Sequence, residues 1–446
     1  MTGSRPARRG RGRSRTPNSD RRAAAMAEQM GQTPARFHDP RMRGFRSRAA
    51  VAEVVALIDR RIAALAAEAV DLREAAGRVL AEAVGAAAPV PPFDRAAMDG
   101  YAVRGEETFG ADAYNPAPFR LLGVARPGRA FPGSVGAGEA VQITTGAPIP
   151  PGADAVAKAE SARVDDATVW ISEATPPGRH VGRQGEDIAA GAAVLAGGRV
   201  LRPQDLGVLS ALGARTIAVV RRPVVAVLVT GDELLPAGTP ARGFQIADMN
   251  SVMLAALIGR DGGVPRVVGP LPDDRAALGA ALAEAAATAD AVLVSGGSSV
   301  GVEDHAPGLV AELGELPVHG VALRPASPAG LGFVGRTPVL LMPGNPVSCL
   351  CAYDFFAGRV VRLLGGRPPQ WPYRRVESPL GPKLVSALGR VDYARVKVVG
   401  GHVEPLAISG ASILSSTTRA DGFVVIPADL EGYPAGAVVT VWLYDR

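Results

Sequence analysis

Residues 295–305 (SGGSSVGVEDH) combine residue types that bind a phosphorylated ligand together with a metal ion. The adjacent glycines Gly296 and Gly297 allow consecutive backbone N–H groups to turn toward one side, which suits an oxyanion such as phosphate. Asp304 adds a carboxylate near the end of the run. Oxyanion-binding backbone beside carboxylates indicates a phosphorylated substrate held with a divalent cation. The alternative interpretation is an ordinary tight turn between a strand and a helix.

Two other runs, TGDE (230–233) and PGNP (343–346), also place polar residues and glycine directly after an apolar stretch. In the second run, Asn345 is placed as the N-cap and Pro346 as the first residue of a predicted helix. Ser348 lies on the first turn of that helix. A helix that begins there is expected to present free N–H groups to an anion.

Residues 223–367 alternate between predicted apolar strands and predicted helices. The three polar runs follow strands of this alternation, so its fold decides where they lie. The predicted strands are 224–229, 264–268, 291–294 and 339–342, and the predicted helices are 251–261, 275–288, 308–313 and 347–364. Fully apolar strands that alternate with helices are typical of a parallel, doubly wound sheet. Ligands bind such sheets at the carboxyl ends of the strands. We therefore expect the three polar runs to meet at one edge of the sheet.

Residues 91–188 and 368–446 are predicted to be β-rich domains that flank this α/β domain. Short apolar runs separated by Pro and Gly turns are typical of a small barrel or sandwich. In the C-terminal domain, residues 389–395 place Arg390 and Arg395 around an expected turn, which suits an oxyanion. A solvent-exposed pair of strands explains the same residues equally well.

Charge and composition exclude several classes of protein. Residues 1–48 hold thirteen arginines against three acidic residues, so the rest of this 446-residue chain is acidic although the whole carries +5. The basic tail, residues 1–45, lacks apolar periodicity, and we expect it to be disordered. Binding of nucleic acid or a membrane surface would rest on this tail alone, so we expect neither partner. No run approaches the ~18 consecutive apolar residues of a membrane span.

Cys349 and Cys351 lie two positions apart in a predicted helix, where they cannot face each other. We expect both thiols to be reduced and buried, as is usual in a cytoplasmic protein.

Six motifs occur in a fixed order along the chain. They are PPFDRAAMDGYAV (91–103), TTGAPIPPGADAV (144–156), GRQGEDI (182–188), VTGDELL (229–235), SGGSSVGVEDH (295–305) and PGNPVS (343–348). With this order and spacing the chain resembles, over residues 49–446, the molybdenum insertase family, the molybdopterin molybdenumtransferases related to the E domain of gephyrin. The resemblance implies an elongated four-domain subunit that forms a homodimer. Its parts would be a linker domain in two segments (46–90 and 189–222), the β-rich domain (91–188), an α/β domain similar to molybdopterin adenylyltransferase (223–367) and the C-terminal β domain (368–446).

The resemblance also implies an activity: a transferase that inserts molybdate into adenylylated molybdopterin, with Mg²⁺ and release of AMP. The acidic residues that it implies for catalysis are Asp99, Asp187, Glu233, Asp248 and Asp304, of which the last three would also hold the metal. The residues that it implies for substrate binding are Thr145, Gly296, Gly297, Ser299, Arg324, Pro343, Gly344, Asn345, Pro346, Ser348, Arg390 and Arg395. Asp99 and Thr145 would face the site across the dimer. Contacts with molybdopterin adenylyltransferase and with apo-molybdoenzymes are implied as well.

Two segments depart from the family pattern. The family shows a KPGKP-type segment where this chain has residues 324–328 (RPASP), so Ser327 replaces an ammonium group beside the expected oxyanion. A QGS-type loop reads Ser409-Gly410-Ala411 here and loses an amide and a hydroxyl. One missing cation beside a dianion costs ~1–3 kcal/mol of binding free energy. The sequence therefore leaves two alternatives open: a paralogue that binds the pterin with weakened molybdate insertion, or a scaffold role.

Overall fold

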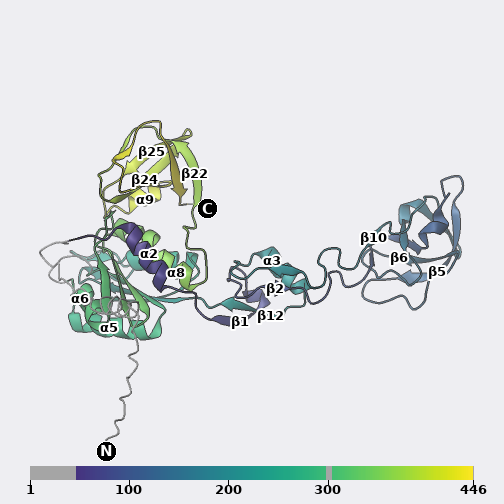
Figure 1. Ribbon diagram of the computed structural model, residues 1–446, viewed down its shortest axis with the longest axis horizontal. Coiled ribbons are helices and arrows are strands. Elements are labelled where there is room, and N and C mark those ends of the chain that lie inside the picture. The colour runs from purple at the N-terminus through teal and green to yellow at the C-terminus, as the bar shows by residue number, and fades with distance from the viewer. Residues whose placement is uncertain (1–46, 298–303, 445–446) are drawn as a thin grey trace, which may run out of the picture. The chain divides into compact units, whose positions relative to one another are not determined.

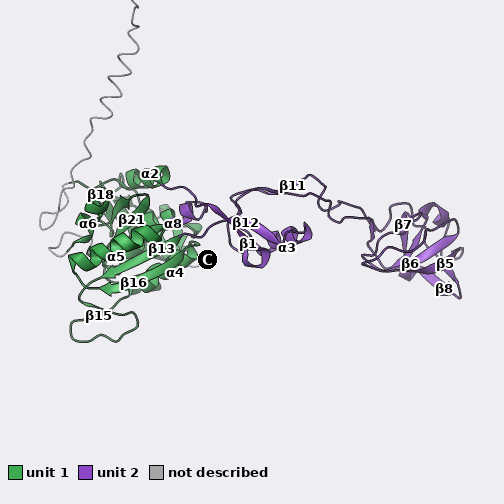
Figure 2. Cartoon of the chain, turned by 90° about the horizontal axis from the view of Figure 1, so that it is seen from below, with its two compact units in different colours: residues 1–61, 224–360, 371–446 green, residues 62–223, 361–370 purple. Residues whose placement is uncertain are grey.

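The computed structural model describes residues 47–297 and 304–444, and the chain divides into two compact units (Figure 2). Unit 1 combines the described parts of residues 1–61, 224–360 and 371–446. Unit 2 combines residues 62–223 and 361–370.

A six-stranded sheet in the order β16-β13-β17-β21-β20-β18 forms the centre of unit 1 (Figure 1). Its strands are β13 (Val224–Thr230), β16 (Val264–Leu271), β17 (Ala291–Ser295), β18 (Glu315–His319), β20 (Gly330–Val334) and β21 (Thr337–Met342). The first four strands of this order pair in parallel, as the alternation of strands and helices predicted. β20 and β18 add to the sheet in antiparallel orientation, so the expectation of a parallel sheet is wrong at that edge.

Glycine explains why β20 escaped prediction. A Cβ atom at Gly332 would lie 2.4 Å from Val310 Cγ1 and 2.6 Å from Glu315 O, so close packing on α6 (Ala306–Leu313) and β18 requires glycine. The strand therefore lacks the continuous apolar run by which the other strands were predicted.

Helices cover both faces of this sheet. They are α4 (Asn250–Arg260), α5 (Arg275–Thr288), α6, α7 (Pro346–Ala352) and α8 (Gly358–Leu364), and a π-helical turn, η4 (Tyr353–Ala357), joins the last two. On one face Leu278, Leu282 and Leu309 from α5 and α6 pack against Leu228 and Val294. The predicted helix 275–288 is confirmed at both ends, whereas the predicted helix 347–364 is interrupted by η4.

Helix α2 (Val51–Arg61) lies within unit 1. Arg359 Nε lies 2.6 Å from Asp59, and Arg61 lies 2.6 Å from Glu315 and over the ring of Phe333. These ion pairs attach the helix to unit 1 along its exposed side.

The C-terminal segment of unit 1 forms a second six-stranded sheet. Its strands are β19 (Leu323–Arg324), β22 (Arg374–Pro379), β24 (Val391–Val399), β25 (His402–Ala407), β26 (Gly422–Ile426) and β28 (Val438–Leu443), and the pair β23 (Leu384–Val385) and β27 (Gly432–Tyr433) and the helix α9 (Ser415–Arg419) complete the segment. Strand β19 comes from the α/β segment and pairs in parallel with β24, so this sheet spans both segments of unit 1.

Unit 2 contains the predicted β-rich domain and the linker. The sheet β7-β4-β6-β5-β9-β8 is built from β4 (Gly100–Val103), β5 (Ala117–Ala125), β6 (Glu139–Ile143), β7 (Ala155–Lys158), β8 (Ala162–Asp165) and β9 (Thr168–Ile171). The short pairs are β1 (Ala67–Asp71) with β12 (Thr216–Val220), β2 (Val84–Gly85) with β11 (Ala193–Leu195), and β3 (Arg95–Ala96) with β10 (Val181–Gly182). The helix α3 (Pro203–Ala211) and the short 3-10 turns η1 (Leu72–Glu74), η2 (Gly105–Thr108) and η3 (Ala159–Ser161) are the remaining elements. The first two pairs join the two linker segments, around a core that includes Leu80, Leu195, Leu201 and Leu209.

Both cysteines are buried free thiols, as predicted. Among the described residues, no helix is long and apolar enough to cross a membrane.

Candidate functional site

A pocket of about 690 Å³ lies in unit 1 at the carboxyl edge of the parallel strands. Thr230 at the end of β13, Ser295 at the end of β17 and Gly344 after β21 all line it. The three polar runs therefore meet at one edge of the sheet, as the sequence predicted. Ser412 of the C-terminal segment lines the same pocket.

The Gly296-Gly297 turn forms part of the pocket wall, and both glycines have positive φ angles of 98° and 55°. A Cβ atom at Gly296 would lie 2.2 Å from Thr230 O, so no side chain fits there. The Cα of Gly296 lies only 3.9 Å from where a Cβ of Gly344 would be. Two of the predicted binding runs are thus in close approach, while Ser299 lies outside the described residues.

The start of α7 also lines the pocket. Asn345 and Pro346 line the pocket, and the buried Pro343 precedes them. The N–H of Val347 donates to Ala411 O at 2.9 Å, so the expectation of free N–H groups at this helix start is wrong for that residue. The C-terminal segment therefore accepts the hydrogen bond that we expected an anion to accept.

The three carboxylates predicted to hold a metal, Glu233, Asp248 and Asp304, all line the pocket. Glu233 is exposed and Asp304 half-buried, whereas Asp248 is 5% exposed and accepts the N–H of Ser251 at 3.1 Å. Within the described ranges, no three His, Cys, Asp or Glu side chains approach closely enough to form a preassembled metal site. The carboxylates fit Mg²⁺ nevertheless, because Mg²⁺ keeps several waters and is usually held by one or two carboxylates together with substrate phosphates.

Two pocket residues, Asn250 and Asp273, were missed by the sequence predictions. Asn250 Nδ2 donates to Ser295 Oγ at 3.0 Å and to Gly344 O at 2.8 Å, which ties α4 to the ends of two strands. Asp273 accepts the hydroxyl of Thr230 at 2.7 Å. Asn250 lies two residues after Asp248 and beside a predicted helix start, and this position could have identified it as a site residue. No comparable sequence pattern marks Asp273.

Arg324, Arg390 and Arg395 do not line this pocket. Arg324 and Arg390 both form ion pairs with the fully buried carboxylate of Asp392. Arg395 is also fully buried and donates from Nη2 to the carbonyl of Ser409. The turn expected at 389–395 is wrong, because β24 runs without a break through Val391–Val399.

Ser348 is 2% exposed, and its hydroxyl donates to Pro325 O at 2.5 Å. The contact positions the segment that carries Arg324 and Ser327 under α7. Around this segment, four buried donor atoms have no hydrogen-bond or ion-pair partner in the part of the chain that the structure describes; they are Arg324 Nε, Ser327 Oγ, Arg395 Nε and Arg395 Nη1. Because each unpaired buried donor costs about 1–3 kcal/mol, this set favours a bound anion or water.

In unit 2, Thr145 and Asp99 are in direct contact. The backbone N–H and the hydroxyl of Thr145 both donate to Asp99 Oδ1, at 2.6 and 2.9 Å. Both bonds lower the pKa of Asp99 below its usual value, and the bond from the backbone N–H has the larger effect. Thr145 also lines a pocket of about 420 Å³. The side chain of Asp187 is exposed, and its backbone N–H donates a hydrogen bond to Val90 O.

This fold and site define a multidomain protein with a polar pocket at the carboxyl edge of an α/β sheet. The chain matches three family models: the MoeA N-terminal region (domain I and II) at residues 49–213, the "probable molybdopterin binding domain" at 226–362, and the MoeA C-terminal region (domain IV) at 377–444. The chain belongs to the MoeA family.

Named relatives agree along most of the chain. Identity is 37% over 384 residues with molybdopterin molybdenumtransferase 2 of Mycobacterium tuberculosis, covering 84% of this chain and 94% of that protein. It is 32% over 381 residues with molybdopterin molybdenumtransferase of Haemophilus influenzae, covering 84% and 93%. A crystal structure of the molybdopterin biosynthesis MoeA protein of Pyrococcus horikoshii matches with a TM-score of 0.74 at 32% identity, covering 89% of this chain and 100% of that chain.

Proposed function

We propose that this protein is a molybdopterin molybdenumtransferase of molybdenum cofactor biosynthesis, which inserts molybdate into adenylylated molybdopterin with Mg²⁺-dependent release of AMP. The observation that supports this most is the convergence of the Gly296-Gly297 turn, the start of α7 and three carboxylates on one pocket. Cleavage of the phosphoanhydride that joins the pterin to AMP needs these parts together: donors for phosphate, acidic residues for a cation, and a cavity that limits water.

The roles follow from position. The backbone at Gly296, Gly297 and Gly344 has no side chains in the way and binds the phosphates and the pterin. Glu233, Asp248 and Asp304 hold Mg²⁺, which when bound neutralises charge that develops on the phosphate oxygens. Asp248 is the most fixed of the three, because it is buried and its carboxylate also accepts the N–H of Ser251.

Molybdate binds beside the segment 324–328, away from the carboxylates. The unpaired donors of Arg324, Ser327 and Arg395 support this, because an oxyanion would satisfy them. Asp392 opposes it, since its buried carboxylate already engages Arg324 and Arg390.

The remaining parts of the proposal concern assembly and location. The protein is a homodimer in the cytoplasm, and Asp99 and Thr145 of one subunit complete the site of the other, with Asp187 as a further acidic residue. The direct contact between Asp99 and Thr145 supports a shared role for this pair. Molybdopterin adenylyltransferase supplies the substrate, and apo-molybdoenzymes receive the product.

A second candidate function is a paralogue in the same pathway that binds the pterin but inserts molybdate weakly. Ser327 in place of an ammonium and the engagement of two arginines by Asp392 favour it. One assay separates the two candidates: the purified protein is incubated with adenylylated molybdopterin, Mg²⁺ and molybdate, and AMP release and cofactor formation are measured. Molybdate-dependent turnover supports the first candidate, and pterin binding without turnover supports the second.

A further inference from the structure

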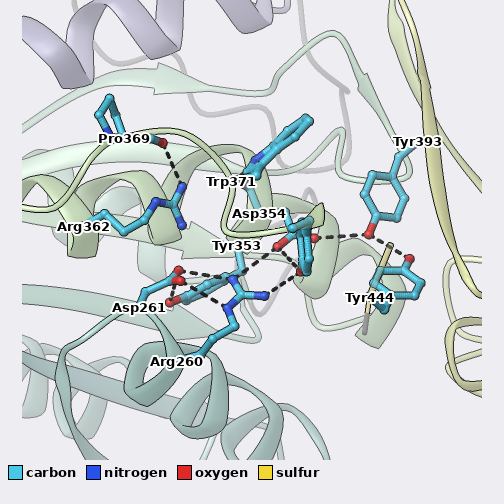
Figure 3. A network of polar contacts seen from close by, with 10 residues as sticks. Arg260, Asp261, Tyr353, Asp354, Arg362, Pro369, Trp371, Tyr393 and Tyr444 are labelled. Carbon is cyan, nitrogen blue, oxygen red and sulfur yellow. Dashed lines mark hydrogen bonds and ion pairs between the residues drawn. The ribbon is translucent and has the colours of Figure 1, made fainter. Parts of the chain in front are cut away.

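A second polar cluster lies where the α/β segment of unit 1 meets its C-terminal β segment (Figure 3). This junction cluster consists of Arg260, Asp261, Tyr353, Asp354, Trp371, Tyr373, Tyr393 and Tyr444. None of these residues lines the pocket, and the proposed function uses none of them.

Asp354, on the π-helical turn η4, is the centre of the junction cluster and is fully buried. Tyr373 donates to its Oδ1 at 2.8 Å, and Tyr393 donates to its Oδ2 at 3.1 Å. The indole N–H of Trp371 donates to its backbone carbonyl at 2.6 Å. Three side chains of the C-terminal segment thus converge on one residue of the α/β segment.

The buried charges of the junction cluster do not balance around Asp354. The guanidinium of Arg260 lies 3.7 Å from Asp354, but makes closer contacts of 3.1 and 3.2 Å with the equally buried Asp261. One cation is shared by two carboxylates, and a second negative charge in the interior is costly unless it is neutralised. A proton on Asp354 removes that charge without moving any side chain.

Arg260 is the cation that acts on Asp354, whereas the buried guanidinium of Arg395 acts on Cys351, Tyr393 and Tyr444, and that of Arg362 donates to the carbonyl of Pro369. The other titratable groups that face Asp354 are a thiol and phenols. On its own helical run lie Tyr353 and Cys351, and burial raises the pKa of the Cys351 thiol. From β24 and from the end of β28 come Tyr393 and Tyr444, whose pKa values burial also raises. Tyr373 precedes β22 and has its pKa raised by burial too, so Cys351, Tyr373, Tyr393 and Tyr444 are neutral near pH 7.

We propose that Asp354 is a proton-operated switch in the joint between the two segments, and that protonation reverses the hydrogen bonds through Tyr393 and Tyr444. When Asp354 is ionised, Tyr444 donates to Tyr393, which donates to Asp354 Oδ2. When Asp354 takes a proton from solvent, Oδ2–H donates to Tyr393, which then donates to Tyr444. The two phenol oxygens are 2.8 Å apart and either can be the donor, so one geometry serves both states.

The remaining contacts fix the direction of the other bonds. Tyr373 accepts from Arg260 at 2.6 Å, so its own hydrogen points to Asp354 Oδ1 in both states. Burial raises the pKa of Asp354 to about 6, and this outweighs the opposing effects of Arg260 and the tyrosine donors. The switch therefore operates within the range of cellular pH.

The switch is connected to the pocket through β24. Arg395 lies two residues after Tyr393 on that strand and holds the carbonyl of Ser409. The loop that begins there carries Ala411, which accepts from Val347, and Ser412, which donates to Asn345 at 2.7 Å. One strand and one loop therefore connect Tyr393, whose hydrogen bonds reverse, to the pocket rim.

The test uses the full chain with Trp170→Phe, because the two tryptophans that remain, Trp371 and Trp442, contact each other at 4.9 Å beside the junction cluster. Fluorescence and the infrared band of a protonated carboxyl are followed as the pH is varied between about 4.5 and 8. We expect one transition near pH 6 that is lost in Asp354→Asn and unchanged in the control Asp165→Asn, an exposed acid of β8 in unit 2. A transition that persists in Asp354→Asn overturns the proposal.

Two more variants keep the proposal testable if Asp354→Asn does not fold. Asp261→Asn removes the competing negative charge, so it should lower the midpoint by about one pH unit. Tyr444→Phe removes the acceptor that Tyr393 needs when Asp354 is protonated, so it should also lower the midpoint. Midpoints that equal that of the Trp170→Phe parent in both variants overturn the proposal.

Discussion

Ser412 donates its hydroxyl to Asn345 Oδ1 at 2.7 Å, and this bond joins the C-terminal segment of unit 1 to the start of α7. Beside it, the N–H of Val347 donates to Ala411 O at 2.9 Å. Because Ser412 and Asn345 both line the pocket, the loop that follows Ser409 is part of the binding site rather than a remote appendage.

Ser412→Ala removes this bond and should weaken binding of AMP about fivefold, because a net hydrogen bond contributes about 1 kcal/mol. Calorimetric titration with AMP measures the change. Thr418→Ala is the matched control, since that exposed hydroxyl bonds only within its own turn, to Ser415 O at 3.0 Å. Equal affinities in the two variants would show that the rim contact does not order the site.

Two glycines of the pocket provide a matched pair. A Cβ at Gly296 would lie 2.2 Å from Thr230 O at a φ of 98°, whereas a Cβ at Gly344 would have nothing closer than 3.9 Å. Gly296→Ala should therefore destabilise the α/β segment by about 1–3 kcal/mol and abolish AMP binding, while Gly344→Ala should fold normally. Denaturant unfolding with AMP titration checks both, and a stable, AMP-binding Gly296→Ala protein would contradict the proposed phosphate turn.

Mg²⁺ dependence should follow Asp248. Asp248→Asn keeps an acceptor for the N–H of Ser251 but removes a negative charge from the pocket, so the fold should persist. The Mg²⁺ concentration for half-maximal AMP release should rise about tenfold or more, because Mg²⁺ prefers anionic oxygen. Glu284→Gln, on the exposed side of α5, is the control. Chelation of Mg²⁺ should stop AMP release and leave pterin binding measurable; an unchanged Mg²⁺ requirement in Asp248→Asn would exclude it as a ligand.

Local pattern in the sequence predicted the parallel strands of the α/β domain and the pocket at their ends. The continuous apolar runs predicted β13, β17 and β21, and the polar residues that end them meet in one pocket as expected. Contacts between distant segments could not be predicted. Nothing near Val347 indicates that its N–H is occupied by Ala411, more than sixty residues later in the chain.

The arginines fell outside prediction for the same reason. Their types and spacing indicated an oxyanion site, but the burial of Asp392 between Arg324 and Arg390 is set by the pairing of β19 with β24. Buried carboxylates that engage such arginines leave no periodic signal in a sequence, because a single Asp on a strand is indistinguishable from a solvent-exposed one.

The stability of the junction cluster should fall as the pH rises. Because the pKa of Asp354 is raised to about 6 in the folded protein, its stabilising effect is complete below the unfolded pKa of about 4 and is lost as the pH rises through about 6. Between pH 4.5 and 7.5 the loss is about 2 kcal/mol in the free energy of unfolding, measured by urea titration of Trp371 fluorescence at these two pH values. In Asp354→Asn this loss of stability between the two pH values should be absent. An equal loss in the variant and in the parent protein would show that it arises from other groups.

Ser327→Lys tests whether the oxyanion side of the site is weakened. Ser327 Oγ is a buried donor without a partner in the described part of the chain, and the neighbouring Arg324 is engaged by Asp392. An added ammonium should lower the molybdate concentration for half-maximal turnover about tenfold, since a charge-assisted contact to a dianion contributes about 1–3 kcal/mol. Ser327→Ala, which adds no charge, should leave the requirement unchanged or slightly higher.

The same pair of variants separates a specific effect from a general one. Tungstate carries the same charge and shape as molybdate. The tungstate concentration for half-maximal turnover should therefore also fall in Ser327→Lys. AMP affinity should stay unchanged, because Ser327 does not line the pocket that we propose for the phosphates. If the molybdate requirement does not fall while AMP binding is retained, the missing ammonium does not limit molybdate binding. The ion pairs of Arg324 and Arg390 with Asp392 would then be the next cause to test, with Asp392→Asn.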